Sequence, residues 1–150
     1  MNPFRILEIG CGTGRNLAGL LKNGPQVFAI DCDFDAVSTA QSILREDGIA
    51  DIRFAVADAV TLPFSSGIFN EVHCIDVLHW ASSTRQFEAM WMESWRVLKV
   101  GGTFFTTLRG DRDDSRWFFA DRALIDALVE QCNAEQLDRT GSALSLRKRL

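Results

Sequence analysis

Three glycines near the start of the chain are spaced so that their backbone can approach a ligand. The stretch RILEIGCGTGRNL places Gly10, Gly12 and Gly14 directly after an apolar run and before a helix-like pattern. Glycine has no Cβ, so such a turn can fold tightly against a bound group. Turns of this composition usually hold a nucleotide, which leaves open the kind of nucleotide.

The spacing of these glycines differs from two common nucleotide-binding patterns. The dinucleotide fingerprint G-x-G-x-x-G would place its third glycine at position 15, which is Arg15, and the G-K-S/T ending of a P-loop is absent. Glu8 stands just before the turn, where a phosphate on the N–H groups of a helix start would meet a negative charge. The sequence therefore favours a ligand with a neutral or cationic part over a pyrophosphate.

Apolar runs and helical stripes predict the elements that must position this turn. Runs typical of strands covered on both faces occur at 4–9, 26–30, 52–56, 70–75 and 103–108. Stripes at helical spacing occur at 17–21, 35–46, 87–98 and 124–132. The C-terminal stretch AEQLDRTGSALSLRKRL alternates weakly around Gly141 and Ser142, which is typical of a hairpin.

This alternation predicts a three-layer α/β sandwich in a single domain of residues 1–150. Its mostly parallel sheet would have seven strands, with helices on both faces and an antiparallel hairpin at the C-terminal end. In such folds ligands bind beyond the carboxyl ends of the strands. The turns at 10–14, 31–33, 58–59 and 75–80 all lie at those ends, so we expect a ligand site there.

Composition narrows the class of protein further. The net charge of −4 and the pI near 5.1 argue against a nucleic-acid binder held by phosphate contacts. No apolar run approaches the ~20 residues of a membrane span, and the first residues do not read as a signal peptide. The four cysteines are scattered, without a C-x-x-C pair. We therefore expect a reduced, cytoplasmic chain with no membrane segment and no metal site.

Four features follow one another in the order and at the spacing of a known family. They are the segment LEIGCGTG, Asp31 at the end of the second run, residues 56–80 (VADAVTLPFSSGIFNEVHCIDVLHW), and residues 95–107 (WRVLKVGGTFFTT). Over nearly its whole length the chain resembles the class I, Rossmann-like S-adenosylmethionine-dependent methyltransferases of small-molecule type. The resemblance implies S-adenosylmethionine as cofactor and S-adenosylhomocysteine as product.

The resemblance also implies which residues bind the cofactor. Asp31 would bind the ribose hydroxyls, Asp58 would accept from the adenine amino group, and Glu8 would order the glycine loop and assist the cationic amino end. The residues assigned to the cofactor in this way are Glu8, Gly10, Cys11, Gly12, Gly14, Asp31, Cys32, Asp58, Ala59, Cys74 and Ile75. The offset of Asp31 from Gly10 is close to the ~20 residues at which an acid meets ribose hydroxyls.

Several of these positions also have a local interpretation. Asp33 is an alternative to Asp31 for the ribose contact, but we interpret it as a helix N-cap before DAVSTAQSIL. Asp58 is otherwise a loop acid in an Asx-turn. We interpret Cys11 as a small apolar filler and not as a nucleophile. Arg15 either faces the carboxylate of the ligand or starts the helix.

Methyl transfer from a sulfonium is an in-line displacement of an already activated group, so the protein mainly supplies proximity and orientation. A general base is needed only where the acceptor must first lose a proton. Asp76 and His79 are the titratable groups expected at the mouth, and we expect His79 mainly to pack and orient its loop. Trp80 and Trp117 are candidate substrate contacts, whereas Trp91 and Trp95 are expected in the core.

Three departures from the family pattern bear on function. The chain begins almost at the first strand, so the N-terminal helices that usually cover the site would have to come from a missing segment or a partner chain. Asn70 and Val100 replace an aspartate and a proline, with little effect expected. Two hypotheses lead: an active methyltransferase on a small-molecule acceptor, or a cofactor-binding regulatory or degenerate partner subunit without turnover of its own. A nicotinamide-dependent reductase is a distant third, because Arg15 stands where the third glycine would be.

Overall fold

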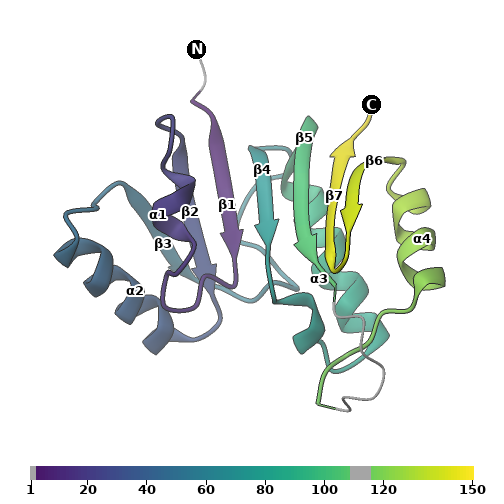
Figure 1. The fold of residues 1–150 in the computed structure, drawn as a ribbon, viewed down its shortest axis with the longest axis horizontal. Coiled ribbons are helices and arrows are strands. Elements are labelled where there is room, and N and C mark those ends of the chain that lie inside the picture. Colours follow the sequence, from purple (N-terminus) through teal and green to yellow (C-terminus); the bar gives the residue numbers. More distant parts are fainter. Residues whose placement is uncertain (1–2, 109–115) are drawn as a thin grey trace.

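A seven-stranded sheet with the order β3-β2-β1-β4-β5-β7-β6 forms the centre of the molecule. The computed structural model describes residues 3–108 and 116–150. The strands are β1 (Arg5–Ile9), β2 (Gln26–Asp31), β3 (Ile52–Val56), β4 (Phe69–Cys74), β5 (Leu98–Thr107), β6 (Ala134–Thr140) and β7 (Ala143–Lys148). The first five are parallel, and β7 and β6 pair antiparallel beside β5 (Figure 1). The predicted Rossmann-like sheet with its C-terminal hairpin is confirmed.

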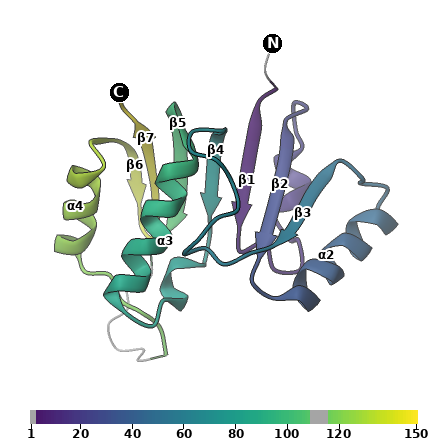
Figure 2. The same cartoon turned by 180° about the vertical axis from the view of Figure 1, so that it is seen from behind.

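Helices cover both faces of this sheet, which completes the predicted three layers. They are α1 (Leu17–Leu20), α2 (Phe34–Glu46), α3 (Thr84–Val97) and α4 (Arg122–Gln131), with a 3-10 turn η1 at Leu78–Trp80. The helices α1 and α2 lie on one face, and α3 lies behind β4 and β5 on the other (Figures 1 and 2). In the described residues, no helix covers the first face where it passes over β4 and β5.

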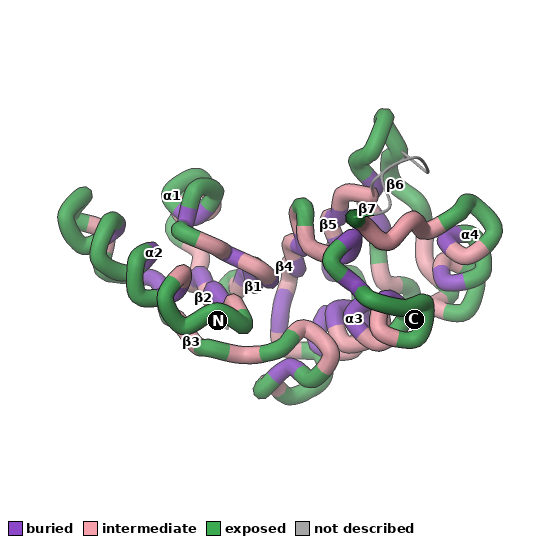
Figure 3. The backbone as a smooth tube through the Cα atoms, turned by 90° about the horizontal axis from the view of Figure 1, so that it is seen from below, coloured by how far each residue is buried: buried purple, intermediate pink, exposed green. Residues whose placement is uncertain are grey.

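The alternation of side chains along the strands supplies a separate core to each face. Along β2, Val27 and Ala29 pack with Leu17 and Val37, whereas Ile30 joins the larger core under α3. Figure 3 shows buried stretches along the sheet and along α3, while much of α2 is exposed. No helix in the described part of the chain is long and apolar enough to span a membrane.

The helix α3 contributes the largest side chains of the core, as its stripe predicts. Trp91 is 0% exposed and Trp95 is 6% exposed. The Trp91 ring meets the Phe104 ring of β5 edge-on, with 5.3 Å between centroids. The helix starts at a capped residue, because the Ser83 side chain accepts a hydrogen bond from the N–H of Gln86.

Two element boundaries differ from the sequence expectation. The helix after the glycine turn is a single turn, Leu17–Leu20, because its N-cap Asn16 makes no side-chain cap bond and Asn23 and Gly24 turn left-handed soon after it. Strand β5 begins at Leu98, earlier than the expected residue 103, because Leu98 pairs with Phe69 across an irregularity in the ladder.

The two substitutions away from the family pattern lie far from the glycine turn. Asn70 Oδ1 accepts from the Arg5 N–H at 2.9 Å and from Lys99 Nζ at 3.0 Å, which ties the start of β1 to β5. Val100 is 55% exposed within β5. Neither side chain reaches the carboxyl ends of the strands, where the ligand site is expected.

Candidate cofactor site

A cavity of about 550 Å³ lies at the carboxyl ends of β1, β2, β3 and β4, where the sequence places the ligand site. The residues that line it are Ile9, Gly10, Gly12, Asp31, Cys32, Asp33, Ala36, Ala57, Asp58, Ala59, Asp76, Val77, Trp80, Gln86 and Met90. Of the predicted cofactor residues, the loop after β1 supplies Gly10 and Gly12, the end of β2 supplies Asp31 and Cys32, and the loop after β3 supplies Asp58 and Ala59. The loop after β4 adds Asp76 and Val77 as a fourth segment. Four separate segments therefore meet around one space.

The glycine turn needs its first glycine for a steric reason that the sequence does not reveal. Gly10 has φ +69°, a left-handed conformation that side chains rarely adopt. A Cβ built at this position would overlap the side chain of Val77, which lies on the loop after β4. Gly10 thus allows the loops after β1 and β4 to approach each other at the wall of the cavity.

Asp31 holds the glycine turn in place while it lines the cavity. Its Oδ2 accepts a hydrogen bond from the Gly12 N–H at 2.8 Å, and its Oδ1 accepts from the Asp33 N–H at 3.0 Å. The Cys11 N–H donates to the Ile30 carbonyl at 2.9 Å, one residue before Asp31. The end of β2 therefore sets the shape of the turn that follows β1.

Asp33 and Asp58 both make the local bonds considered from the sequence. The Asp33 side chain accepts from the N–H groups of Asp35 and Ala36, so it is the N-cap of α2, as predicted. Asp58 Oδ1 accepts from the Val60 N–H at 3.0 Å, an Asx-turn contact. Asp58 also lines the cavity, so its local bond and a ligand contact are compatible.

The loop that follows Asp58 is anchored by an ion pair on α3. Arg96 donates to both carboxylate oxygens of Glu93, and its other N–H groups reach the carbonyls of Leu62 and Phe64. Glu93 accepts from the Leu62 N–H at 2.7 Å. The hydrogen bonds from Arg96 hold the pKa of Glu93 below its usual value. This network fixes the segment that leads away from Asp58.

Glu8 lies behind the glycine turn and does not line the cavity. It is 2% exposed, its Oε1 accepts from Asn16 Nδ2 at 3.3 Å, and among the described residues its Oε2 has no hydrogen-bond partner. The nearest cationic candidate is His73, whose Nδ1 lies 4.0 Å from Oε2. Burial raises the pKa of Glu8 to about 7. Its bond from Asn16 connects it to the residue before α1, and its role in ordering the glycine turn stays a prediction.

Several other predicted cofactor residues stand outside the lining. Cys11 is 8% exposed and Cys74 is 0% exposed. Burial, followed by the charges of Asp31 and Glu8, raises the pKa of the Cys11 thiol to about 12, and burial also raises the pKa of Cys74. Both thiols stay protonated, consistent with Cys11 as a filler. Gly14, Ile75 and the exposed Arg15 do not line the cavity either.

The mouth of the cavity is built from the loop after β4 and from the end of β5. Asp76 has φ +57°, and Thr107 Oγ1 both accepts from the Asp76 N–H at 2.7 Å and donates to Asp76 Oδ1 at 3.1 Å. Trp80 lines the cavity and is 66% exposed. The loop after β4 thus contributes an acidic and an aromatic side chain to the wall of the cavity.

Trp80 belongs to an aromatic cluster with His79 and Trp117. The rings of Trp80 and Trp117 meet edge-on with centroids 4.4 Å apart, and the His79 ring lies 4.9 Å from that of Trp117. His79 is 4% exposed, and its carbonyl accepts from the Phe118 N–H at 2.8 Å. Of the three substrate candidates, Trp80 alone lines the cavity, and His79 packs behind it as expected.

The lining residues that the sequence analysis did not assign to the ligand come mostly from α3 and from short loops. Gln86 and Met90 lie one turn apart on α3, and the sequence placed Met90 only within the helical stripe at 87–98. Val77 lies against Gly10, and Thr107 bonds Asp76, so each joins segments of the site that are distant in sequence. Neighbouring parallel strands end at the same edge, which puts Thr107 near the loop after β4, but its contact with Asp76 depends on the register of the two strands.

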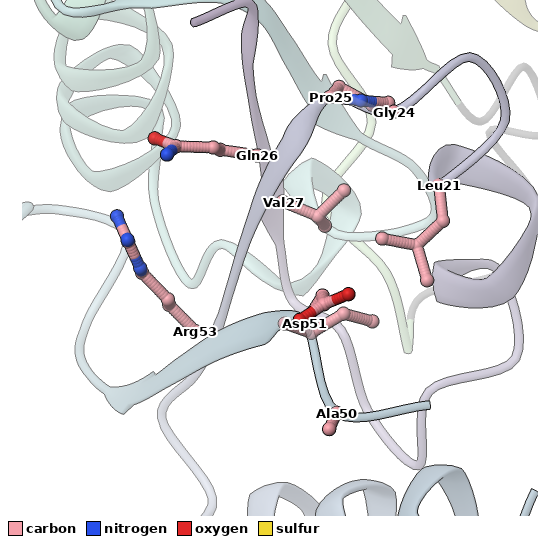
Figure 4. Close-up of a pocket in the computed structure, with 9 residues that line it drawn as sticks. Leu21, Gly24, Pro25, Gln26, Val27, Ala50, Asp51 and Arg53 are labelled. Carbon is pink, nitrogen blue, oxygen red and sulfur yellow. The ribbon is translucent and has the colours of Figure 1, made fainter. Parts of the chain in front are cut away.

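A second cavity, of about 470 Å³, lies at the opposite end of the sheet. It is lined by residues at the amino ends of β2 and β3, among them Leu21, Pro25, Gln26 and Arg53 (Figure 4). The predicted cofactor residues are absent from its lining. The described residues contain no group of three or more metal-binding side chains. The first cavity is therefore the one that matches the sequence expectation.

Comparisons with known proteins agree with this geometry. A family described as "Methyltransferase domain" matches residues 6–102. The uncharacterized methyltransferase YcgJ of Bacillus subtilis is 30% identical over 100 residues, which cover 67% of this chain and 38% of YcgJ. The malonyl-[acyl-carrier protein] O-methyltransferase of Herminiimonas arsenicoxydans is 30% identical over 152 residues, covering 87% of this chain and 55% of that protein. The chain thus spans about half or less of the length of these relatives.

The fold is also shared with solved structures. In a Haloferax volcanii complex between a methyltransferase activator and a methyltransferase, the matching chain superposes with a TM-score of 0.81 at 14% identity, covering 99% of this chain and 83% of that chain. At this identity the similarity concerns the fold alone. With the family match over residues 6–102, the chain belongs to the class I, Rossmann-like S-adenosylmethionine-dependent methyltransferase family.

Proposed function

We propose that this protein transfers a methyl group from S-adenosylmethionine to a small-molecule acceptor by in-line displacement. One observation carries the proposal: the glycine turn, Asp31 and Asp58 meet around a single cavity of about 550 Å³. Cavities for small ligands and cofactors commonly measure about 300–1,000 Å³. The lining contains aspartates and apolar residues but, within the described residues, no lysine or arginine that would favour a pyrophosphate.

The residues of the cavity fit the chemical groups of this cofactor. An ionised carboxylate has about four acceptor positions. Asp31 uses two of them for the N–H groups of Gly12 and Asp33, which leaves capacity for two ribose hydroxyls. Asp58 uses one position for the Val60 N–H and has others for the adenine amino group. Ala59 lies beside it in the cavity wall and would pack against the ring.

The cofactor supplies an activated methyl group. The main tasks of this chain are therefore to orient the cofactor and the acceptor and to exclude water, and activation of the acceptor is secondary. The glycine turn brings the backbone close to the ligand, and Asp31 keeps that turn in shape. Met90 and Val77 provide apolar wall beside the mouth, and Asp76 and Trp80 face the acceptor side. No proton transfer is required for acceptors that arrive without a proton on the reacting atom.

A covering element from outside this chain is a second part of the proposal. Trp80 at the mouth is 66% exposed, a large apolar surface beside a site that works better when water is excluded. A further segment of a longer protein or a partner chain would cover it. The Haloferax volcanii structure, in which a chain of this fold is complexed with a methyltransferase activator, gives a precedent in another protein.

The open mouth also favours a second candidate function, a cofactor-binding subunit without turnover of its own. Both candidates predict cofactor binding, and turnover separates them. The test is a methyl-transfer assay with S-adenosylmethionine and a panel of small amines, alcohols, thiols and carboxylic acids. The amount of S-adenosylhomocysteine formed measures turnover. Acceptor-dependent product formation supports the enzyme. Binding of S-adenosylhomocysteine without product from any acceptor, alone or with a co-purified partner, supports the second candidate.

A further inference from the structure

We propose that the acceptor carries a basic amine nitrogen, which Asp76 and Trp80 recognise at the mouth of the cavity. The inference rests on the proposed methyl transfer and names the substrate class for the same site. Asp76 and Trp80 both line the cavity. Neither has a role toward the cofactor, because Asp31 and Asp58 are the acids assigned to it. Their chemistry, a carboxylate beside an exposed indole, suits a cationic or hydrogen-bond-donating nitrogen.

Asp76 has free acceptor capacity, as Asp58 does, but only that of Asp58 is assigned to the cofactor. Both oxygens of Asp31 accept backbone N–H groups, and Asp33 caps α2. Asp76 accepts from the Thr107 hydroxyl through Oδ1, and among the described residues no donor bonds its Oδ2. That second oxygen is available for an N–H group of a ligand, and a bond from a charged donor is the stronger kind.

Thr107 keeps the Asp76 side chain at the cavity. The same hydroxyl accepts from the Asp76 N–H at 2.7 Å and donates to the carboxylate at 3.1 Å, so backbone and side chain are held together. Asp76 has φ +57°, where aspartate and asparagine are tolerated better than other non-glycine residues. The carboxylate is thus placed before a ligand arrives, which lowers the cost of ordering it on binding.

The aromatic side of the mouth favours the same class of ligand. A tryptophan face attracts a cation within about 6 Å of the ring. Trp80 is 66% exposed and is backed by Trp117, with ring centroids 4.4 Å apart. The Arg116 guanidinium carbon lies 5.9 Å from the Trp117 ring, and Trp117 does not line the cavity. Trp80 does line it and would contact the amine that enters.

The charge of the lining disfavours acidic acceptors. Four aspartates line the cavity, Asp31, Asp33, Asp58 and Asp76, and the described lining includes no lysine or arginine to neutralise them. A carboxylate acceptor would be repelled as it approached, whereas an ammonium ion would be attracted. The lining therefore selects amines over carboxylic acids before any chemistry occurs.

The reaction on a primary amine balances without a further reagent. The ammonium form gives one proton to bulk water at the open mouth, and the lone pair of the free amine then forms the N–C bond to the methyl carbon. The C–S bond breaks and its electron pair stays on sulfur. The products are a methylated ammonium ion and S-adenosylhomocysteine, so the positive charge moves from sulfur to nitrogen. Asp76 would stabilise this charge as it develops.

The test uses sinefungin, an analogue in which a carbon bearing a primary ammonium group replaces the methylated sulfonium. It places an ammonium at the position of the transferred methyl group, pointing toward the side from which the acceptor would approach. Dissociation constants for sinefungin and S-adenosylhomocysteine are measured by calorimetry for the wild type, Asp76→Asn, and Asp51→Asn as the matched control. Asparagine tolerates the backbone of Asp76, and Asp51 is an exposed aspartate at the opposite end of the sheet. Thr107→Val, which removes the hydroxyl that bonds the Asp76 N–H and carboxylate, is the second variant.

The wild type and Asp51→Asn should bind sinefungin at least about tenfold more tightly than S-adenosylhomocysteine, because of the charge-assisted bond to Asp76. Asp76→Asn should lose most of that preference, and Thr107→Val part of it, while affinity for S-adenosylhomocysteine changes little. An unchanged preference in Asp76→Asn, or loss of S-adenosylhomocysteine binding in that variant, overturns the inference. Failure of the wild type to bind either compound instead overturns the proposed function.

A second readout tests the acceptor class directly. With saturating S-adenosylhomocysteine, thermal melting is followed with phenethylamine and with 3-phenylpropionate, two probes of similar shape and opposite charge. The amine should raise the melting midpoint of the wild type more than the carboxylate does, and Asp76→Asn should remove the difference. Equal shifts for the two probes, or a larger shift with the carboxylate, overturn the inference.

Discussion

Asp31 Oδ2 accepts a hydrogen bond from the Gly12 N–H at 2.8 Å, so an acid at the end of β2 shapes the turn that follows β1. The same carboxylate lines the cavity. It therefore has two functions, one within the chain and one toward the ligand. Substitution of Asp31 is expected to change both cofactor affinity and the stability of the turn.

Replacement of Asp31 by alanine should weaken S-adenosylhomocysteine binding by about 1–3 kcal/mol, because ligand hydroxyls and backbone N–H groups lose their acceptor. The free energy of unfolding should fall by about 1 kcal/mol for the same reason. Calorimetric titration and urea denaturation measure the two effects. Asp35→Ala, at an exposed position in the first turn of α2, is the control and should bind normally. Unchanged affinity in Asp31→Ala would show that the ribose contact is placed wrongly.

Asp58 allows its local bond and its ligand contact to be separated. Asp58→Asn can keep the bond from the Val60 N–H, since the amide oxygen accepts, whereas Asp58→Ala cannot. We expect both variants to lose about 1–3 kcal/mol of cofactor affinity, because the charged acceptor for the adenine amino group is lost. Only Asp58→Ala should also lower the melting midpoint. Equal affinity of wild type and both variants would remove Asp58 from the site.

Gly10 and Val77 are predicted to be coupled. Gly10→Ala places a Cβ into the Val77 side chain at a backbone φ of +69°, so it should destabilise the fold by about 1–3 kcal/mol. Val77→Ala removes the overlap but not the unfavourable φ. In a double-mutant cycle followed by urea denaturation, the two changes should therefore show a coupling of about 1 kcal/mol. Additive effects would mean that the two loops do not touch as described.

The positions of these side chains show how far the sequence could predict the site. Gly10, Asp31 and Asp58 each follow an apolar run, and parallel strands bring such positions to one edge, so their meeting was predictable. Thr107 beside Asp76 was not, because the contact joins the ends of two strands whose exact registers depend on an irregularity between β4 and β5. Met90 was predicted only as part of a helical stripe and Gln86 was not singled out, since whether either side chain reaches the cavity depends on how α3 packs.

Glu8 should make stability depend on pH. Its pKa is raised to about 7 in the folded protein against an ordinary 4.5, so between these values the unfolded chain releases a proton that the folded chain keeps. The free energy of unfolding should therefore fall as pH rises through this window, by up to about 3 kcal/mol at about 1.4 kcal/mol per pH unit, and level off above pH 7. Urea denaturation across this pH range measures the effect.

Glu8→Gln should remove most of this fall, and Glu46→Gln, at the exposed end of α2, should leave it in place. The titratable neighbours of Glu8 are His73, whose Nδ1 lies 4.0 Å from it, and Glu71, which contacts His73 at 3.0 Å. Their contribution to the pH dependence has to be separated from that of Glu8. The comparison is therefore repeated in a His73→Gln background, where the effect of the Glu8→Gln substitution on the pH dependence should persist. Parallel pH curves for wild type and Glu8→Gln would show that Glu8 does not retain its proton.

The central claim, that the cavity at the carboxyl ends of β1 to β4 holds S-adenosylmethionine, is tested most directly by calorimetric titration of the purified chain. S-adenosylmethionine, S-adenosylhomocysteine and NADH are titrated separately. We predict dissociation constants in the micromolar range for the first two compounds and no binding of NADH, because position 15 lacks the third glycine of the dinucleotide fingerprint and the described cavity lining contains aspartates but no lysine or arginine. The absence of heat with both S-adenosyl compounds, together with binding of NADH, would contradict the account.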